Sequence, residues 1–397
     1  MPGKKKKILL VHSQLVQHGS ERYLFEISKA LNKDLFEVHI LTRFFLIRRN
    51  YYYPKLIELG CQIHTRLLSI RHLRYPFKKI YNRYSIVRKA LKLIHSSLLE
   101  LLYFNFFDDF DLIAVIGIET YCDALSPILD DHKNVVIHHV THDFQFERNY
   151  FNELKQNKII ICDNKQAIEV ENSGIQDAET YFMPLPMVFD QDLKINRKST
   201  LIKKTIRIAV FSRLFKDRPN EPLFRGFAAF KEKYPNAELL FYGSGDPIQY
   251  KELLNELNLN SSVFFKGHST SIINSINQDH IDIIWLVSMG KSISYSSIET
   301  AQLGMPMVFW NLDDSDSLTI KQETEGAINS FNKIEDFVDF NLSIVIDQSK
   351  LNEVGSRLRE YVKNYYDIQK NIKQLQDYYI EKSKLKSITT KKTLIKI

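Results

Sequence analysis

Short runs of apolar, β-branched residues alternate with helical stretches along this chain, and the alternation occurs twice. Continuously apolar strands separated by helices are typical of parallel sheets that are covered by helices on both faces. The first series predicts strands at Ile8–His12, Phe36–Thr42, Gln62–Leu67, Asp111–Gly117, Val135–Thr141, Lys158–Asp163 and Thr180–Met183. The second series follows a polar stretch and predicts strands at Ile206–Ser212, Ala237–Gly243, Val263–Gly267, Ile281–Val287 and Met307–Trp310. The sequence therefore predicts an α/β protein with two Rossmann-like, doubly wound parallel-sheet domains that face a central cleft.

Chain length agrees with two domains, because 397 residues are more than one compact core usually contains. We expect an N-terminal domain at residues 1–195 and a second domain at residues 196–355. A helix at residues 356–382 is expected to cross back to the first domain, followed by a basic tail at residues 383–397. Predicted helices include Ser20–Leu31, Tyr121–Leu129, Tyr250–Leu257, Ser296–Leu303 and a terminal helix near Arg357–Ile380.

The net charge of +7 is unevenly distributed. Between Arg66 and Lys92 the sequence has nine lysines or arginines and no aspartate or glutamate. On an α-helix, one stripe of this region would combine aromatic, basic and apolar side chains, namely Phe77, Tyr81, Tyr84, Arg88 and Leu91. Such a stripe suits docking on an anionic membrane surface. A half-buried helix with a solvated basic face is the alternative.

Other sequence features limit which binding partners and which cellular location we expect. No nucleic-acid-binding motif is present, so nucleic acid is not an expected partner. No apolar run approaches the length of about 18 residues that a membrane-spanning helix needs. The three cysteines are isolated in the sequence, which favours a reducing compartment. We expect a cytoplasmic protein that is peripheral on the inner face of the cell membrane.

Polar residues follow the predicted strands of the second domain, where parallel α/β sheets bind their ligands. Arg213 and Arg218 follow the first of these strands and could clamp a diphosphate with their planar guanidinium groups. Gly243 opens a G-x-G turn after the second strand, and Gly267 with His268 ends the third, where a flat base could stack. Solvated loop cations and ordinary turns are the alternatives at these positions.

The strongest signal follows the fourth strand of this domain. A polar loop at residues 288–294 leads into a helix that carries Glu299 and ends at Gly304-Met305-Pro306. The start of a helix offers free N–H groups and the positive end of a dipole to a phosphate. Glu299, about one turn into the helix, could accept hydrogen bonds from the two hydroxyls of a ribose.

These motifs, taken in order, give the segment Ile206–Asn311 a specific resemblance. It resembles the donor-binding domain of GT-B glycosyltransferases, in particular glycosyltransferase family four. The first domain agrees, because the strand Ile8–His12 is followed by a glycine-containing loop, His18-Gly19-Ser20-Glu21-Arg22. The segment Met183-Pro184-Leu185-Pro186 and the terminal helix also fit, so the resemblance covers nearly the whole chain.

The resemblance implies a retaining transferase that uses a nucleoside-diphosphate sugar, UDP- or GDP-linked, with no tightly bound cofactor and no metal. Gly19 would approach the diphosphate and the sugar through its backbone. Arg213 and Arg218 would neutralise the diphosphate, although position 218 is usually a lysine in this family. Glu299 would hold the ribose. The backbone of the preceding loop would meet the sugar hydroxyls or the β-phosphate, at Ser292, Ile293, Ser294 and Tyr295.

One position departs from the family pattern. The family often has two glutamates in this region; the second matches Glu299, but the first falls on Lys291. We hypothesise that Lys291 meets an anionic group of the donor, either a phosphate or an acidic sugar. A lysine turned to solvent is the alternative.

Histidines cluster at the end of the strand Val135–Thr141. In enzymes similar to this chain, a histidine at this strand end lies beside the donor sugar, and His142 or His139 would fill that role. Asp143 lies next to them, and a histidine or an aspartate here could polarise an acceptor hydroxyl. Asp313, Asp314 and Asp316 have D-x-D spacing, which we interpret as a loop or helix cap and not as a metal site.

The expected acceptor is a glycan or lipid-linked glycan of bacterial-type surface polysaccharide synthesis. Two alternatives share this two-domain shape. A nucleotide-sugar 2-epimerase would need acidic residues for proton abstraction, and Lys291 weakens that interpretation. A catalytically degenerate, glycosyltransferase-like binding protein is the other alternative.

Overall fold

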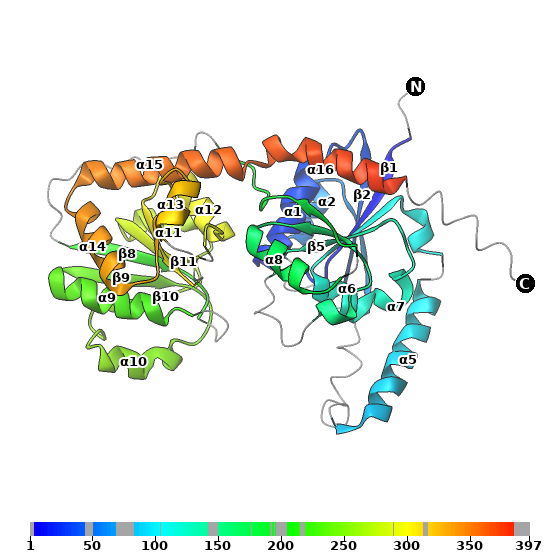
Figure 1. Cartoon of the computed structure of the whole chain (residues 1–397), viewed down its shortest axis with the longest axis horizontal. Helices are drawn as coiled ribbons and strands as arrows, with labels where there is room; N and C mark the ends of the chain where they lie inside the picture. Colours follow the sequence, from blue (N-terminus) through cyan, green and yellow to red (C-terminus); the bar gives the residue numbers. More distant parts are fainter. Residues whose placement is uncertain are drawn as a thin grey trace, which may run out of the picture. The chain divides into compact units, whose positions relative to one another are not determined.

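The computed structural model describes residues 4–43, 51–68, 83–103, 105–141, 150–175, 177–190, 193, 195, 205–214, 219–288, 290–312 and 317–384. The chain divides into two compact units. Unit 1 comprises Met1–Val188 and Ile368–Ile397, and unit 2 comprises Phe189–Asp367. The chain therefore passes twice between the units, and its last helix belongs with the N-terminal sheet (Figure 1).

Unit 1 is built on a seven-stranded parallel sheet with the order β3-β2-β1-β4-β5-β6-β7. The strands are β1 (Lys6–Val11), β2 (Phe36–Arg43), β3 (Gln62–Leu67), β4 (Leu112–Ile116), β5 (Val135–His139), β6 (Lys158–Ile161) and β7 (Glu179–Phe182). Every residue of β4 and β5 is buried, whereas the edge strands β3 and β7 are largely accessible. The central strands are continuously apolar because helices cover both of their faces.

The helices of unit 1 lie on both sides of this sheet, and α1 and α16 lie side by side (Figure 1). They are α1 (Gly19–Ala30), α2 (Tyr53–Glu58), α5 (Ser85–Leu102), α6 (Ile118–Ala124), α7 (Ser126–Leu129), α8 (Asn164–Asn172) and α16 (Ile368–Ser383). Short 3-10 turns occur at Phe107–Asp109 and Phe151–Glu153.

Unit 2 has a six-stranded parallel sheet with the order β10-β9-β8-β11-β12-β13. The strands are β8 (Ile206–Phe211), β9 (Ala237–Tyr242), β10 (Val263–Gly267), β11 (Ile283–Ser288), β12 (Met307–Asn311) and β13 (Ser330–Phe331). The helices are α9 (Glu221–Lys233), α10 (Lys251–Glu256), α11 (Ile272–Gln278), α12 (Tyr295–Gln302), α13 (Ser317–Glu323), α14 (Ile334–Val345) and α15 (Gln348–Tyr365). A 3-10 turn at Pro247–Tyr250 precedes α10.

An aromatic cluster fills the core of unit 2. The ring of Trp285, which is fully buried, meets Phe337 edge-on at a centroid distance of 4.7 Å and Phe230 at 5.6 Å. Its indole N–H donates a hydrogen bond to Asn341 Oδ1 at 2.6 Å. The only polar atom of this large side chain is thereby satisfied, which makes its complete burial favourable.

Two predicted helices differ from the structure, and one strand has no predicted counterpart. The terminal helix is two helices, because α15 ends at Tyr365 and α16 begins at Ile368, whose N–H donates to the Met187 carbonyl oxygen at 2.9 Å. The predicted helix Tyr121–Leu129 is also divided into two, α6 and α7, because a proline at the first turn of α7 disfavours a continuous helix. The two-residue strand β13 was not predicted.

Candidate functional site

The loops that follow β8, β9 and β10 are joined by backbone hydrogen bonds. The Ser212 N–H donates to the Tyr242 carbonyl oxygen at 3.0 Å, and the Leu214 N–H donates to the Ser244 carbonyl oxygen at 2.8 Å. The Gly243 N–H donates to the Gly267 carbonyl oxygen at 2.8 Å. The carboxyl ends of three neighbouring strands therefore form one connected rim, at the edge of the sheet where ligands of such folds bind.

Two glycines make this rim possible. A Cβ atom on Gly243 would lie 1.8 Å from the Ser212 carbonyl oxygen, and one on Gly245 would lie 2.4 Å from the Leu214 carbonyl oxygen. Gly245 also has a φ of +122°. The G-x-G turn is therefore required by the close approach of its own neighbouring loop. Gly267 differs, because a Cβ there would meet nothing within 4 Å, although its φ is +75°.

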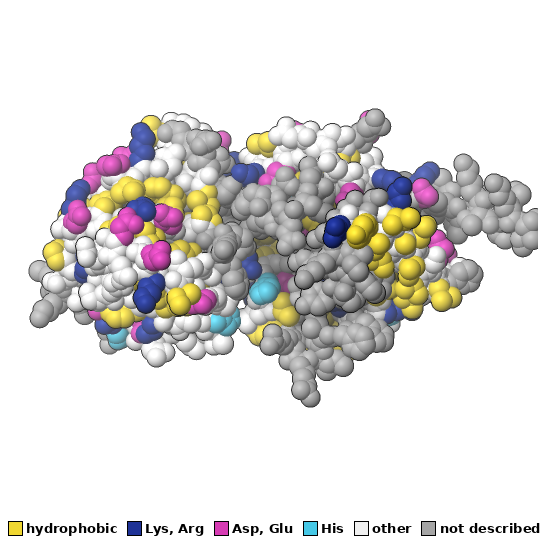
Figure 2. Space-filling view, turned by 90° about the horizontal axis from the view of Figure 1, so that it is seen from below, with side chains coloured by type: hydrophobic (Ala, Val, Ile, Leu, Met, Phe, Trp, Pro, Cys, Tyr) yellow, Lys and Arg dark blue, Asp and Glu magenta, His cyan; other side chains and the backbone are white. Residues whose placement is uncertain are grey.

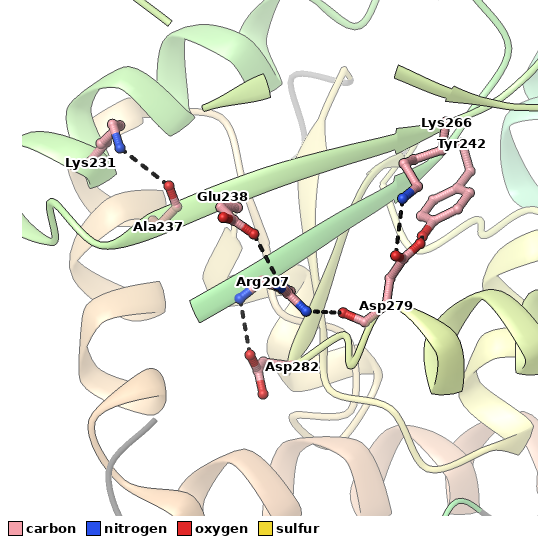
Figure 3. A network of polar contacts seen from close by, with 8 residues as sticks. All are labelled: Arg207, Lys231, Ala237, Glu238, Tyr242, Lys266, Asp279 and Asp282. Carbon is pink, nitrogen blue, oxygen red and sulfur yellow. Dashed lines mark hydrogen bonds and ion pairs between the residues drawn. The ribbon is translucent and has the colours of Figure 1, made fainter. Parts of the chain in front are cut away.

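A polar network supports β9 directly before the glycine turn (Figure 3). The Tyr242 hydroxyl donates to Asp279, Lys266 Nζ lies 3.0 Å from Asp279 Oδ1, and Arg207 Nη1 donates to the Asp279 carbonyl oxygen at 3.1 Å. Burial and the bond to the carboxylate raise the pKa of Tyr242. Burial acts to raise the pKa of Asp279, but the hydrogen bonds from Tyr242 and Lys266 outweigh it and hold the pKa below its usual value.

The two predicted arginines have different outcomes. Arg213 lies in the rim after β8, partly exposed, and its carbonyl oxygen accepts a 2.9 Å hydrogen bond from Nδ2 of the fully buried Asn220. This bond fixes the backbone that carries the guanidinium group. Arg218 lies outside the described residues. His268, next to Gly267, is exposed on the same rim.

The segment that leads from β11 into α12 is fixed at both ends. The Gly290 N–H donates to Asn311 Oδ1 at 2.9 Å, and Ser294 caps α12 by accepting a 3.3 Å hydrogen bond from the Ser297 N–H. Ile293 is buried, so that residue can offer a ligand its backbone only. Glu299 lies one turn into α12 and is partly exposed.

The start of α12 therefore has the geometry of an anion-binding site. Tyr295 is the first helical residue, and Ser292 lies between the fixed Gly290 and the cap. The N–H groups of the first helical turn have no partners within the helix, and the helix dipole favours negative charge near them. An anionic ligand at this point would have Glu299 about one turn away along the helix.

Lys291 forms an ion pair with Glu323 of α13, with Nζ 3.1 Å from Oε2. The two side chains are 30% and 49% exposed, so water screens this pair and its effect on stability is small. The lysine at the position of the missing glutamate thus has a carboxylate beside it. No sequence signal pointed to this partner, which lies on a helix that contributed nothing to the predicted site.

In unit 1, Gly19 is the first residue of α1 and is exposed. The preceding residue, His18, is extended and makes no side-chain cap. The N–H groups at the start of α1 are therefore not capped by that side chain, as the predicted contact of Gly19 with a diphosphate would require. His142 and Asp143 lie outside the described residues.

His138 and His139 are both completely buried. His138 Nδ1 lies 2.9 Å from the Tyr23 hydroxyl, and its Nε2 lies 2.8 Å from the Tyr379 hydroxyl. Burial lowers the pKa of His138 to about 3, so the ring is neutral and belongs to the interior of unit 1. His139 Nε2 lies 2.8 Å from Glu169 Oε2, and the Phe151 ring packs edge-on against it.

Two polar side chains at the carboxyl edge of the unit 1 sheet were not predicted from the sequence. His12 follows β1 and is 2% exposed; its Nδ1 contacts the Gln14 backbone, whereas its Nε2 has no partner within the described structure. The Thr120 hydroxyl, in α6 after β4, is also buried without a described partner. The available signal was position, because His12 ends one predicted strand and Thr120 follows another.

No group of three or more His, Cys, Asp or Glu residues among those described could hold a metal ion. Asp313, Asp314 and Asp316 are not among those residues.

No protein-family model matches the chain. Two curated proteins are similar to part of it. One is the UDP-Gal:α-D-GlcNAc-diphosphoundecaprenol α-1,3-galactosyltransferase of Escherichia coli, 24% identical over 155 residues, which is 37% of this chain and 38% of the relative. The other is an uncharacterized glycosyltransferase of Methanocaldococcus jannaschii, 24% identical over 160 residues, which is 38% of this chain and 39% of the relative. The chain thus matches well under half the length of these relatives.

Solved structures match the whole fold. Anabaena HepE, in complex with UDP and glucose, has a TM-score of 0.65 at 14% identity, covering 94% of this chain and 99% of that one. The lipopolysaccharide outer core galactosyltransferase WaaB has a TM-score of 0.61 at 12% identity, covering 97% and 99%. Together with the two parallel sheets, these similarities confirm the predicted GT-B fold.

Proposed function

We propose that this chain is a metal-independent glycosyltransferase. It moves a sugar from a UDP- or GDP-linked donor to a glycan or lipid-linked glycan, with retention, in bacterial-type surface polysaccharide synthesis. It works on the cytoplasmic side of the cell membrane, as a peripheral protein that contacts the anionic membrane surface.

One observation carries the donor part of this proposal. In unit 2, the rim after β8, β9 and β10 and the start of α12 bring a guanidinium group, the N–H groups of a helix start and a carboxylate to the same edge of one sheet. Breaking a glycosyl–phosphate bond requires that the negative charge of the departing diphosphate be stabilised. Fixed N–H dipoles and a cation such as Arg213 supply that stabilisation without reorganising during the reaction.

Glu299 would bind the ribose, because a carboxylate accepts hydrogen bonds from two neighbouring hydroxyls at once. The backbone from Ser292 to Tyr295 would contact the sugar or the β-phosphate, and Gly19 would approach the same group from unit 1. His139, His142 and Asp143 remain the proposed residues beside the donor sugar and the acceptor hydroxyl. Because His139 is completely buried, its proposed role is to orient its neighbours.

The comparisons support this choice of substrates by analogy. The Escherichia coli relative is named for a UDP-linked galactose donor and a diphosphoundecaprenol-linked acceptor, and HepE was crystallised with UDP and glucose. Retention rests on the resemblance to family four, and the anomeric configuration of the product tests it directly by NMR.

A thermal-shift titration tests the donor site. A nucleotide at about a hundredfold its Kd stabilises the folded state by about 2.7 kcal/mol, which raises the Tm of a unit of this size by roughly 5–10 °C. We expect a shift with either UDP or GDP and their sugars, and at least a tenfold weaker apparent affinity for Glu299→Ala. Glu252→Ala, an exposed glutamate of α10, is the matched control and should titrate as the wild type does.

The chemistry is then tested with the nucleotide identified. Release of a nucleoside diphosphate upon addition of acceptor identifies a transferase, whereas an epimerised sugar on an intact nucleotide identifies a 2-epimerase. Nucleotide binding without either product leaves the degenerate binding protein. If no nucleotide shifts the Tm, the donor site itself is refuted.

A further inference from the structure

We propose that α5 of unit 1 is a membrane-docking helix that lies in the interface of an anionic bilayer. Its inserting surface, here called the α5 outer face, consists of Ile86, Leu93, Ile94 and Leu101. The inference deepens the proposed function by naming the surface that meets the membrane. Its test does not depend on transferase activity.

The α5 outer face is exposed and apolar. Ile86, Leu93 and Leu101 retain 75%, 69% and 77% of their exposure, and Ile94 retains 51%. These residues recur about two helical turns apart, which places them on one side of the helix. Exposed apolar side chains scattered singly over a surface need no explanation, but a continuous row along one helix marks a site of interaction.

The opposite side of α5 is anchored in unit 1. Leu99 is fully buried in the hydrophobic core, and Tyr103, directly after the helix, is buried beside it. His95 is also buried, with Nε2 3.2 Å from the Leu68 carbonyl oxygen. The buried residues on the opposite side therefore hold α5 in place, with its outer face toward solvent. Figure 2 shows hydrophobic side chains gathered on the face of the molecule that carries α5.

Charge identifies a bilayer as the partner. Four lysines or arginines occur between residues 83 and 92, and the first acidic residue after them is Glu100. Arg83, two residues before the helix, and Lys89, in its second turn, are both exposed. Cations next to an apolar row are complementary to a bilayer, whose anionic head groups lie next to its acyl chains. Each cation near such a surface contributes favourably to membrane binding.

The helix is suited to lying in the interface and not to crossing the membrane. Its 18 residues give a length of about 27 Å, but they include two lysines, one arginine and one glutamate. No helix among the described residues is long and apolar enough to span a bilayer.

The structure corrects the stripe predicted from the sequence. Tyr84 precedes α5 in an extended conformation, with φ −118° and ψ 119°, so it is not part of one continuous helical stripe with Leu91. Leu91 is partly buried, and Phe77 and Tyr81 lie outside the described residues. The exposed apolar row instead begins at Ile86 and continues beyond Lys92, the last residue of the basic region predicted to dock on the membrane.

Vesicle co-sedimentation tests the inference with the full chain. We expect the wild type to bind vesicles of phosphatidylcholine with 30% phosphatidylglycerol at least about tenfold more strongly than pure phosphatidylcholine, with weaker binding at high salt. The double variant Leu93→Asp, Leu101→Asp should lose at least tenfold in binding. The double variant Arg83→Glu, Lys89→Glu should also lose at least tenfold in vesicle binding at low salt.

A matched control places the same change elsewhere. Ile248→Asp, Leu318→Asp alters two leucine-sized side chains of unit 2 that are 68% and 67% exposed, and it should bind vesicles as the wild type does. Circular dichroism and Tm confirm that each variant folds. Unchanged vesicle binding by the α5 variant overturns the proposal. A wild type that ignores vesicles but forms a dimer that the α5 variant abolishes also overturns it, in favour of a second copy of the chain.

The outcomes separate this inference from the proposed function. Vesicle binding that needs the α5 outer face, in a protein that binds no nucleotide, would support the inference and refute the donor site. If the protein binds nucleotide but its vesicle binding does not depend on α5, the donor site is supported and the inference about α5 is refuted. Thermal shifts with nucleotides should be equal in wild type and α5 variants, because α5 contains none of the residues proposed to contact the nucleotide.

Discussion

His138 makes the stability of unit 1 depend on pH in a way that can be calculated. The ring is fully buried between the hydroxyls of Tyr23 and Tyr379, which lie on α1 and α16. A neutral imidazole donates from one nitrogen and accepts at the other, so the uncharged ring can bond to both tyrosine hydroxyls. Protonation in the folded state would place an unpaired charge in the interior.

The magnitude follows from the two pKa values. The pKa of His138 is about 3 in the folded protein, whereas an unfolded histidine has a value of about 6.5. Because the folded pKa is the lower one, the unfolded chain binds the proton first as the pH falls. The contribution is fully present above about pH 6.5 and is lost progressively below it. Between pH 7.5 and pH 5.0 the free energy of unfolding should fall by about 2 kcal/mol from this residue alone.

The assay must report on unit 1 alone. Both tryptophans, Trp285 and Trp310, lie in unit 2, so tryptophan fluorescence does not follow the unfolding of unit 1. Hydrogen exchange of peptides from β5 and α16, corrected for the intrinsic effect of pH, measures opening where His138 lies. Between pH 7.5 and pH 5.0 the wild type should lose about thirtyfold more protection than His138→Gln.

The glutamine variant isolates the titration. Its amide keeps a donor and an acceptor but cannot be protonated in this range, and other histidines contribute equally to both proteins. His268→Gln changes an exposed histidine in unit 2 and should leave the unit 1 peptides unchanged. Equal pH dependence in wild type and His138→Gln would refute the reasoning, because it would mean that the buried ring does not resist protonation.

Three further predictions concern unit 2. Gly243→Ala should lower the free energy of unfolding of unit 2 by at least about 2 kcal/mol, because the new Cβ meets the Ser212 carbonyl oxygen. Urea titration of tryptophan fluorescence measures this change, and a neutral effect would show that the two loops separate easily. Lys291→Glu should weaken donor binding by about tenfold, or 1.4 kcal/mol, by calorimetry. The exchanged pair Lys291→Glu, Glu323→Lys should not restore it if the lysine meets the donor directly, whereas full recovery would mean that only the ion pair matters. Asp279→Asn should reduce the urea-measured stability by about 1–2 kcal/mol, since it weakens charge-assisted hydrogen bonds at the end of β9, and unchanged stability would contradict this.

The strands could be predicted well because they depend on local composition. The predicted bounds Gln62–Leu67 and Val263–Gly267 agree with β3 and β10. Buried parallel strands need apolar, β-branched residues at consecutive positions, which a single sequence shows directly. By contrast, the break between α15 and α16 occurs where the chain passes between the two units, and its hydrogen bond partner, Met187, is far away in the sequence.

The candidate site likewise has features that could be predicted from the sequence and features that could not. Residues that follow a strand could be placed at the carboxyl edge of a sheet, as Arg213 and Gly243 were. Side-chain partners could not, because His138 meets residues 115 and 241 positions away in the sequence, and nothing local distinguishes it from an exposed histidine. Lys291 likewise acquires Glu323 through the packing of α13, which no spacing rule predicts.

The glycine turn illustrates how a correct location can have a different physical cause. Gly243 was predicted in the nucleotide site because glycine allows a ligand to approach the backbone, yet in this structure a side chain there would meet the loop after β8. Lost nucleotide binding in a Gly243 variant would therefore not prove contact with the nucleotide, because the rim itself would be displaced. Glu299 is partly exposed on α12, so its truncation removes a carboxylate without a cavity in the core. Lost binding at unchanged stability of unit 2 in Glu299→Ala would thus identify direct contact, and only that combination would.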